Sequence, residues 1–156
     1  MQIRHYITSD KDEVIQMVKQ TIYSVNKKDY NYKQILAWTA INESSWDHSV
    51  ANHQAIVMID NSNKIIGFAD MDDNGYLENL FVHKNYQNMS IGTKLVTNLE
   101  THTQCKEFST FASITAKPFF EKLGYDVVRK NIALLRGQYF KNYYMKKANN
   151  IKFNQI

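Results

Sequence analysis

One continuous segment constrains the fold of this chain more than any other. Residues 75–100 read GYLENLFVHKNYQNMSIGTKLVTNLE. An apolar stretch interrupted by Glu78 predicts a strand, and an apolar repeat from Ile91 to Leu99 predicts an amphipathic helix. The loop between them delivers Gly92 at the helix start, where free backbone N–H groups and the positive end of the helix dipole suit a phosphate. With a carboxylate upstream as proton acceptor, the segment indicates an enzyme that holds a phosphorylated cofactor.

The composition is that of an ordinary globular protein. The chain has 156 residues, of which 44% are hydrophobic and 22% charged, enough for one domain with a core. No apolar run approaches the ~20 residues that span a bilayer, and the N-terminal residues lack the apolar core of a signal peptide. The single cysteine, Cys105, cannot form an internal disulfide, which fits a reducing compartment. We therefore expect a cytoplasmic protein without a membrane partner.

The net charge of +4 is mild, and the basic residues concentrate toward the C-terminus. Such a region can contact nucleic acid, but we expect a solvated surface or a contribution to binding an anionic cofactor. The basic residues concerned are Arg129, Lys130, Arg136, Lys141, Lys146, Lys147 and Lys152. The five histidines show no metal-ligand spacing, so no metal site is predicted.

The periodicity along the chain predicts an α/β (α+β) fold, with a mixed, mostly antiparallel central sheet flanked by helices. An Asp10–Glu13 capping box would start the first helix, which runs to about residue 25. Further helices are predicted over 32–41, 91–104 and 115–123, and strands over 2–7, 54–60, 64–71, 76–83, 107–112, 126–135 and 138–146. Residues 42–53 are expected to form a polar loop. Residues 1–147 would form one domain, followed by a frayed polar tail at 148–156.

Two motifs carry a family resemblance. The strand GYLENLFVH followed by QNMSIG resembles the acyl-CoA motif of the GNAT superfamily of N-acetyltransferases, in which Gln87 and Gly92 fit the loop pattern. Downstream, SITAKPFFEKLGY resembles the second GNAT signature. The fitting residues are Ala116, Phe119, Glu121, Lys122, Leu123 and Gly124. Both motifs, in this order, identify nearly the whole chain as similar to that superfamily.

The resemblance implies acetyl-CoA as cofactor and assigns residues to it. The pantetheine arm would run along Leu80, Phe81 and Val82, and Thr93 would add a hydroxyl to the phosphate site. Ser113 and Phe120, in the second motif, would also lie against the cofactor. The pyrophosphate would rest on the backbone of the loop formed by Gln87, Asn88, Met89, Ser90, Ile91 and Gly92.

Three residues depart from the family pattern. Ser90 stands at the first glycine of the loop, Ser113 at a common asparagine, and Phe120 where many members have a tyrosine that acts as general acid. A serine restricts the backbone more than glycine does, so we expect altered phosphate binding. Phe120 cannot donate a proton, although a thiol with a pKa near ~8.5 can leave as a thiolate with little help. Tyr125, Tyr143 and Tyr144 are candidate substitute acids, although packing or a surface position explains each of them better in a chain with 13% aromatic residues.

Glu78 is the candidate general base, because an amine must lose a proton to attack a thioester. The alternatives are that Glu78 orients a cationic substrate or pairs with His83. Asp70 could also attract an amine, whereas Asp73 reads as turn chemistry. Trp38 and Trp46 could flank a substrate or pack in the interior.

The resulting prediction is an N-acetyltransferase that moves acetyl from acetyl-CoA to a primary amine by direct attack in a ternary complex. The acceptor would be a small molecule or a peptide, and a homodimer is possible. The alternative is a catalytically degenerate module that binds or senses acyl-CoA, which the identities of Ser90 and Phe120 favour.

Overall fold

A single seven-stranded sheet, in the order β1-β2-β3-β4-β5-β7-β6, organises the molecule. The structure is a computed structural model that describes residues 1–150. The strands are β1 (Gln2–His5), β2 (Gln54–Ile59), β3 (Ile65–Met71), β4 (Tyr76–Val82), β5 (Glu107–Ser113), β6 (Asp126–Leu135) and β7 (Gln138–Ala148). The helices are α1 (Lys11–Thr21), α2 (Tyr32–Thr39), α3 (Glu43–Ala51), α4 (Ile91–Thr101) and α5 (Lys117–Lys122). Short helical turns occupy Thr8–Asp10 (η1), Ile22–Asn26 (η2, a π-helix) and Lys84–Tyr86 (η3).

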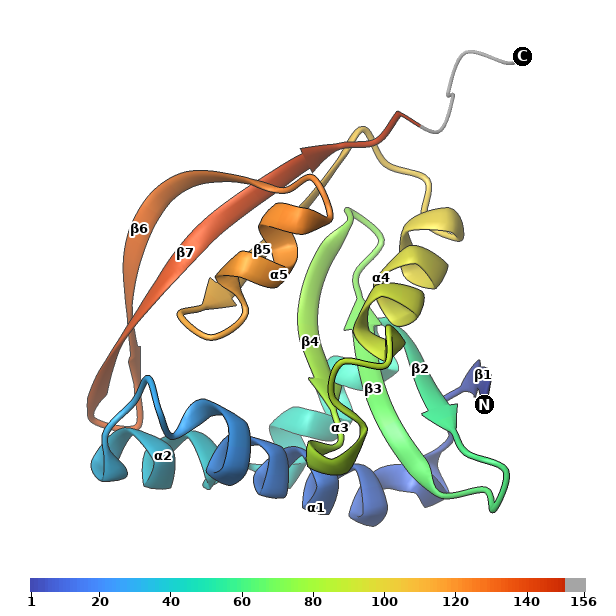
Figure 1. The fold of residues 1–156 in the computed structure, drawn as a ribbon, viewed down its shortest axis with the longest axis horizontal. Helices are drawn as coiled ribbons and strands as arrows, with labels where there is room; N and C mark the ends of the chain where they lie inside the picture. Colours follow the sequence, from blue (N-terminus) through green and yellow to red (C-terminus); the bar gives the residue numbers. More distant parts are fainter. Residues whose placement is uncertain (151–156) are drawn as a thin grey trace.

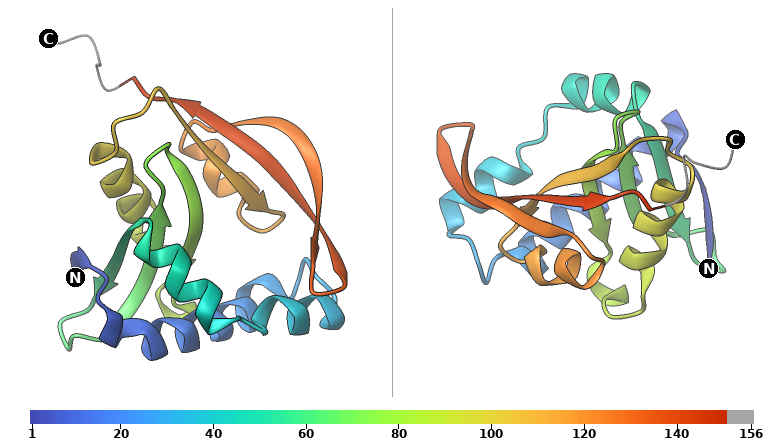
Figure 2. Two further views of the ribbon diagram at one scale, coloured as in Figure 1. Left: turned by 180° about the vertical axis from the view of Figure 1, so that it is seen from behind. Right: turned by 90° about the horizontal axis from the view of Figure 1, so that it is seen from above.

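Helices cover both faces of the sheet, and each face has its own apolar cluster. Seen from above in Figure 2, α4 and α5 lie on one side of the sheet and α3 on the other. Leu95 and Leu99 of α4 pack with Phe108 and Met145 on the first side. The cluster on the second side combines side chains from α1, α2 and α3 with strand residues, among them Val14, Val18, Ile35, Trp46, Phe68 and Phe140. This two-sided packing confirms the predicted α/β domain with a mostly antiparallel sheet.

The sheet opens between its two parallel neighbours, β4 and β5. They pair only at Tyr76 with Ser109 and at Leu77 with Thr110. Beyond these residues the strands diverge toward their C-terminal ends, as Figure 1 shows. Every other pair of neighbouring strands is antiparallel. The opening leaves one edge of β4 without a strand partner.

Residues 42–53 form helix α3 where we expected a polar loop, so that prediction is wrong. The Asn42 side chain caps the helix by accepting the Ser45 N–H at 2.9 Å. The serines and the aspartate of this segment are weak helix formers, so neither helix propensity nor an apolar repeat predicts a helix here. Trp46 supplies the buried face of the helix: it is 8% exposed and lies 5.1 Å from the Phe68 ring.

The predicted capping box at the start of α1 is also wrong, because both carboxylates have other partners. Asp10 accepts two hydrogen bonds from the Arg4 guanidinium, at 2.8 and 2.9 Å, and one from the Ile7 N–H at 2.9 Å. Glu13 accepts the N–H of Ile65, the first residue of β3, at 2.7 Å. The two acids therefore tie α1 to the sheet and to the chain entering the helix.

The C-terminal end of the domain lies slightly beyond the predicted boundary. β7 continues to Ala148, and Asn149 donates its backbone N–H to Lys106 O at 2.9 Å and its side-chain amide to Cys105 O at 2.8 Å. The tail predicted to be frayed is therefore anchored at its start. Residues 151–156 of that tail lie outside the described residues.

We expect Trp46→Ala to lower the free energy of unfolding by about 3–5 kcal/mol, because it empties a buried site between α3 and β3. Urea denaturation measures the loss. Trp38→Ala is the matched control, since Trp38 is only half buried, and its loss should be smaller. Equal losses for the two variants would show that α3 does not pack as the structure describes.

Candidate functional site

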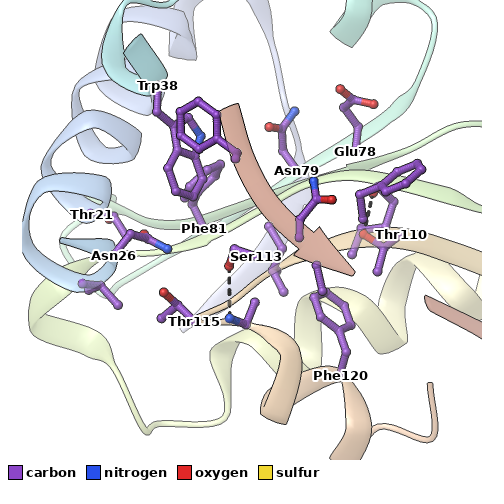
Figure 3. A pocket seen from close by; sticks show the side chains of 18 of the residues that line it. Thr21, Asn26, Trp38, Glu78, Asn79, Phe81, Thr110, Ser113, Thr115 and Phe120 are labelled. Atoms are coloured by element: carbon purple, nitrogen blue, oxygen red, sulfur yellow. Dashed lines mark hydrogen bonds between the residues drawn. The ribbon is translucent and has the colours of Figure 1, made fainter. Parts of the chain in front are cut away.

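A cavity of about 350 Å³ occupies the opening between β4 and β5. β4 lines it from Leu77 to Val82 and β5 from Thr110 to Ser113. Figure 3 shows Glu78 on one side of this pocket and Thr21 and Asn26 on the opposite side. The cavity gathers residues that are far apart in the chain, so its walls come from both motifs and from the turn between α1 and α2.

The free edge of β4 turns backbone groups into the opening. The Asn79 N–H points toward β3, donating to Asp70 Oδ1 at 3.0 Å, and the His83 N–H donates to Ile66 O at 2.9 Å. Because successive residues of a strand point their backbone groups to opposite sides, the N–H groups of Leu80 and Val82 face the opening. These are the donors that an extended ligand between the strands would use.

Glu78 is the extra residue of a β-bulge. Asp70 pairs with Asn79 and Met71 with Leu77, so Glu78 has no partner on β3. A bulge of this kind re-aims a side chain, and Glu78 is both solvent-accessible and part of the pocket wall. Partial burial among the pocket walls, with the nearby carboxylate of Asp70, raises the pKa of Glu78 above its ordinary value. The shift makes Glu78 a better proton acceptor near neutral pH.

The histidine whose charge acts on Glu78 is His53, and the alternative that Glu78 pairs with His83 is wrong. His83 lies at the far end of β4, where its Nδ1 accepts the Asn85 N–H at 3.0 Å. His53 lies just before β2, and its Nδ1 is 2.8 Å from Asp70 Oδ2. No spacing in the sequence marks His53, because only the pairing of β2 with β3 places it beside Asp70.

Four residues of the second motif line the pocket, among them the two that were predicted to touch the cofactor. Ser113 Oγ accepts the Ala116 N–H at 3.0 Å, which leaves the hydroxyl proton available to the cavity. Phe120 lines the cavity at 3% exposure and packs edge-on against Phe119 and Tyr125. Both residues predicted to touch the cofactor are therefore in the same pocket as β4.

None of the three tyrosines considered as substitutes for the missing acid lines the pocket as the structure describes it. The Tyr125 hydroxyl donates to Glu100 Oε2 at 2.8 Å. Burial, and to a lesser extent the negative charge of Glu100, raise the pKa of Tyr125 strongly. Tyr144 stacks under Arg129, 4.8 Å from the ring centre. Tyr143 lies under a lysine ammonium on α5, at 5.2 Å.

The α1–α2 connection also contributes to the pocket, although no motif in the sequence predicted this. Tyr30 lines the cavity, but its hydroxyl is engaged, donating to Lys141 O at 3.0 Å and accepting the Ile114 N–H at 2.9 Å. Asn26, in the π-helix η2, is 7% exposed and also lines it. A π-helical turn is typical of functional sites, but nothing in the sequence predicts it here. Of the two tryptophans, Trp38 lines the pocket and Trp46 belongs to the core.

The loop that precedes α4 contains the residues that were expected to hold the pyrophosphate. Asn88 and Ser90 both adopt left-handed backbone conformations, with φ of 60° and 61°. Gln87 fixes the loop by donating to Val82 O at 2.6 Å. The first hydrogen bond of α4 joins the Lys94 N–H to Ser90 O at 3.0 Å. The N–H groups of Ile91, Gly92 and Thr93 come before this first bond, so the helix does not use them and they remain available to an anion. The loop residues from Gln87 to Thr93, Met89 included, lie outside the cavity lining.

Gly92 has a packing role that the sequence did not reveal. A Cβ at this position would lie 3.1 Å from Cζ of Phe119 on the α5 motif. Gly92 therefore lets the start of α4 approach α5 closely. The close approach joins the two motifs physically.

The acidic turn after β3 and the basic C-terminal region have structural partners. Asp72 Oδ1 accepts the N–H groups of Asn74 and Tyr76, both at 2.9 Å, which is turn chemistry. Lys146 pairs with Glu107 at 2.8 Å and Lys147 with Glu100 at 3.0 Å, so the basic C-terminal region is partly neutralised. Lys152 lies outside the described residues.

Within residues 1–150 no cluster of metal-ligating side chains occurs, and no helix is long and apolar enough to cross a membrane.

Comparisons with known proteins agree with this geometry. Residues 26–146 match the family model described as an acetyltransferase (GNAT) domain. The chain is 32% identical over 146 residues to the N-acetyltransferase YafP of Escherichia coli K12, covering 94% of this chain and 95% of that one.

Solved structures show the same fold. A GCN5-related N-acetyltransferase from Rhodopseudomonas palustris superposes with a TM-score of 0.90 at 24% identity, covering 94% of each chain. The PaiA N-acetyltransferase of Thermoplasma acidophilum, solved with coenzyme A, superposes with a TM-score of 0.75 at 16% identity, covering 94% of this chain and 98% of that one. The extent of the family match and the identity to YafP together place this chain in the GNAT family of acetyltransferases.

Proposed function

We propose that the chain transfers the acetyl group of acetyl-CoA to a primary amine by direct attack in a ternary complex. The observation that carries the proposal is the opening between β4 and β5, where Leu80 and Val82 present free N–H groups beside Glu78. The family match and a relative solved with coenzyme A support this choice of cofactor. The lone Cys105 supports a cytoplasmic location.

The residues present fit coenzyme A at two places. The unpaired N–H groups at the start of α4 suit its pyrophosphate, and the free edge of β4 suits its extended pantetheine arm. Bound acetyl-CoA supplies an activated thioester. The Leu80 N–H faces the opening, where it can stabilise negative charge on the thioester oxygen.

Glu78 acts as the general base. It takes the proton from the acceptor nitrogen, either directly or through a water, as the nitrogen–carbon bond forms. The carbon–sulfur bond breaks and the sulfur keeps its electron pair. Phe120 offers no proton, so the sulfur departs as a thiolate, which a thiol pKa near ~8.5 permits. The Ser113 hydroxyl is positioned in the pocket to donate a hydrogen bond to it.

Release of free coenzyme A thiol, measured with a panel of primary amines, tests the proposed reaction. Acetyl transfer to at least one amine supports it. The second candidate, a non-catalytic acyl-CoA-binding module, is favoured by the buried Phe120 in place of a proton donor. Tight acetyl-CoA binding without turnover for any amine would support the module instead.

We expect Glu78→Gln to lower kcat by about 10²–10⁴-fold, because a general base contributes on that scale, and to leave the affinity for acetyl-CoA unchanged. In the wild type, activity should fall as the pH drops through the raised pKa of Glu78, since only the carboxylate accepts a proton. The measurement is kcat/KM from pH 5 to 9. The inflection caused by Glu78 should be absent from the variant, whose residual activity should follow only the ionisation of the acceptor amine.

Glu121→Gln is the control for this substitution. Glu121 also follows the family pattern, but it lies on the exposed surface of α5 and outside the cavity lining. Its kcat should stay within about twofold of wild type. A Glu78→Gln enzyme with near wild-type turnover would exclude the base role and leave Glu78 as a residue that orients the substrate.

A separate prediction concerns Ser90, whose left-handed backbone is unfavourable for a residue with a side chain by about 1–2 kcal/mol. Ser90→Gly should raise the free energy of unfolding by about 0.5–1 kcal/mol, after the larger unfolded-state entropy of glycine is counted. Thermal denaturation should show a Tm higher by roughly 2–3 °C. The control is Asn88→Gly: asparagine tolerates this conformation better, so the gain should be smaller.

A further inference from the structure

The region beneath Glu78 contains a buried ion pair that the proposed chemistry does not use. Asp70 on β3 is 0% exposed, and its Oδ2 lies 2.8 Å from His53 Nδ1. The His53 side chain is 14% exposed. Burying a carboxylate costs several kcal/mol unless hydrogen bonds and a counter-charge compensate. Two hydrophobic side chains would serve the fold at lower cost, so the position of the pair calls for an explanation.

The pair is joined to the bulge that carries Glu78. Asp70 Oδ1 accepts both the backbone N–H and the side-chain amide of Asn79, each at 3.0 Å. Asn79 directly follows Glu78 in the bulge. The Asn79 N–H therefore bonds to a side-chain carboxylate, where a regular ladder would supply a backbone carbonyl. Asp70 holds the strand in the bulged form, and His53 holds Asp70.

We propose that His53 and Asp70 are positioning residues that fix the bulge and set the pH at which Glu78 can accept a proton. The inference rests on the proposed role of Glu78 as base. Neither residue touches the reacting atoms: both lie outside the cavity lining. Their action on the reaction passes through Asn79 and through the local field.

The charges around Glu78 support a role for both members. Burial has the largest effect and raises the pKa of Glu78; of the charges, the Asp70 carboxylate raises it, His53 lowers it, and Asp72 in the following turn raises it. The hydrogen bond to Asp70 raises the pKa of His53, so the imidazole keeps its positive charge to a higher pH than usual. The other group near these acids, Tyr76, has a pKa raised by burial and by Glu78, and so stays neutral. While His53 is protonated, it screens the Asp70 charge from Glu78.

The test measures kcat/KM against pH for His53→Gln, Asp70→Asn and the double variant, with a reactive amine and saturating acetyl-CoA. The quantity compared is the acidic limb, which is the pH at which Glu78 becomes protonated and activity falls. Glutamine can still donate to Asp70 but carries no charge. The uncompensated carboxylate should then move the acidic limb of His53→Gln to higher pH by about one unit. Adding Asp70→Asn to His53→Gln removes that carboxylate and should return the limb toward the wild-type position. Asp70→Asn alone should lower kcat by loosening the bulge, with a smaller shift of the limb.

His48→Gln is the matched control, because His48 is an exposed histidine on α3 outside the cavity lining, and the acidic limb of this variant should not move. A folded His53→Gln enzyme whose limb is unmoved, or moves to lower pH, overturns the inference. If Asp70→Asn fails to fold, the contrast between His53→Gln and His48→Gln still decides. If Glu78→Gln keeps an inflection at the same pH as the wild type, the base role itself is refuted, so the two failures can be told apart.

Discussion

The separation of β4 from β5 is the constraint on which the rest of the structure depends. A sheet normally satisfies every backbone group with its neighbours, and here the pairing stops after Leu77 and Thr110. The N–H groups of Leu80 and Val82 are left facing a cavity, where an unpaired donor is unfavourable unless a ligand or water meets it. The fold therefore contains an extended binding edge before any side chain is considered, and both motifs are arranged around it.

A second constraint is the way the bulge at Glu78 is maintained. A bulge interrupts the ladder, and the Asp70 carboxylate supplies the missing acceptor for Asn79. That carboxylate is itself tolerated in the interior because His53 lies against it. The orientation of one pocket residue thus depends on a charge pair that lies on the neighbouring strand and on the loop before β2. The two helical motifs are joined by packing, because Gly92 lets the start of α4 approach the ring of Phe119 closely.

Local patterns in the sequence predicted most of the elements, since each depends on neighbours in the chain. The apolar repeat from Ile91 to Leu99 predicted α4, and alternation with turn residues predicted the strands. The failures have specific causes. Helix α3 is built from weak helix formers and is held by the contact of Trp46 with Phe68. The Asp10–Glu13 pair has the spacing of a capping box, but Asp10 binds Arg4 and Glu13 accepts the Ile65 N–H instead.

The sequence by itself determined the family, the loop before α4 and the candidate base, because motifs of adjacent residues carry these features. Only the tertiary structure decided what surrounds that base. The pairing of β2 with β3 brings His53 to Asp70, and the π-helical turn brings Asn26 to the pocket. These contacts join residues distant in the chain, and their energies come from burial and charge in three dimensions. No local spacing encodes them, so a single sequence could not place them.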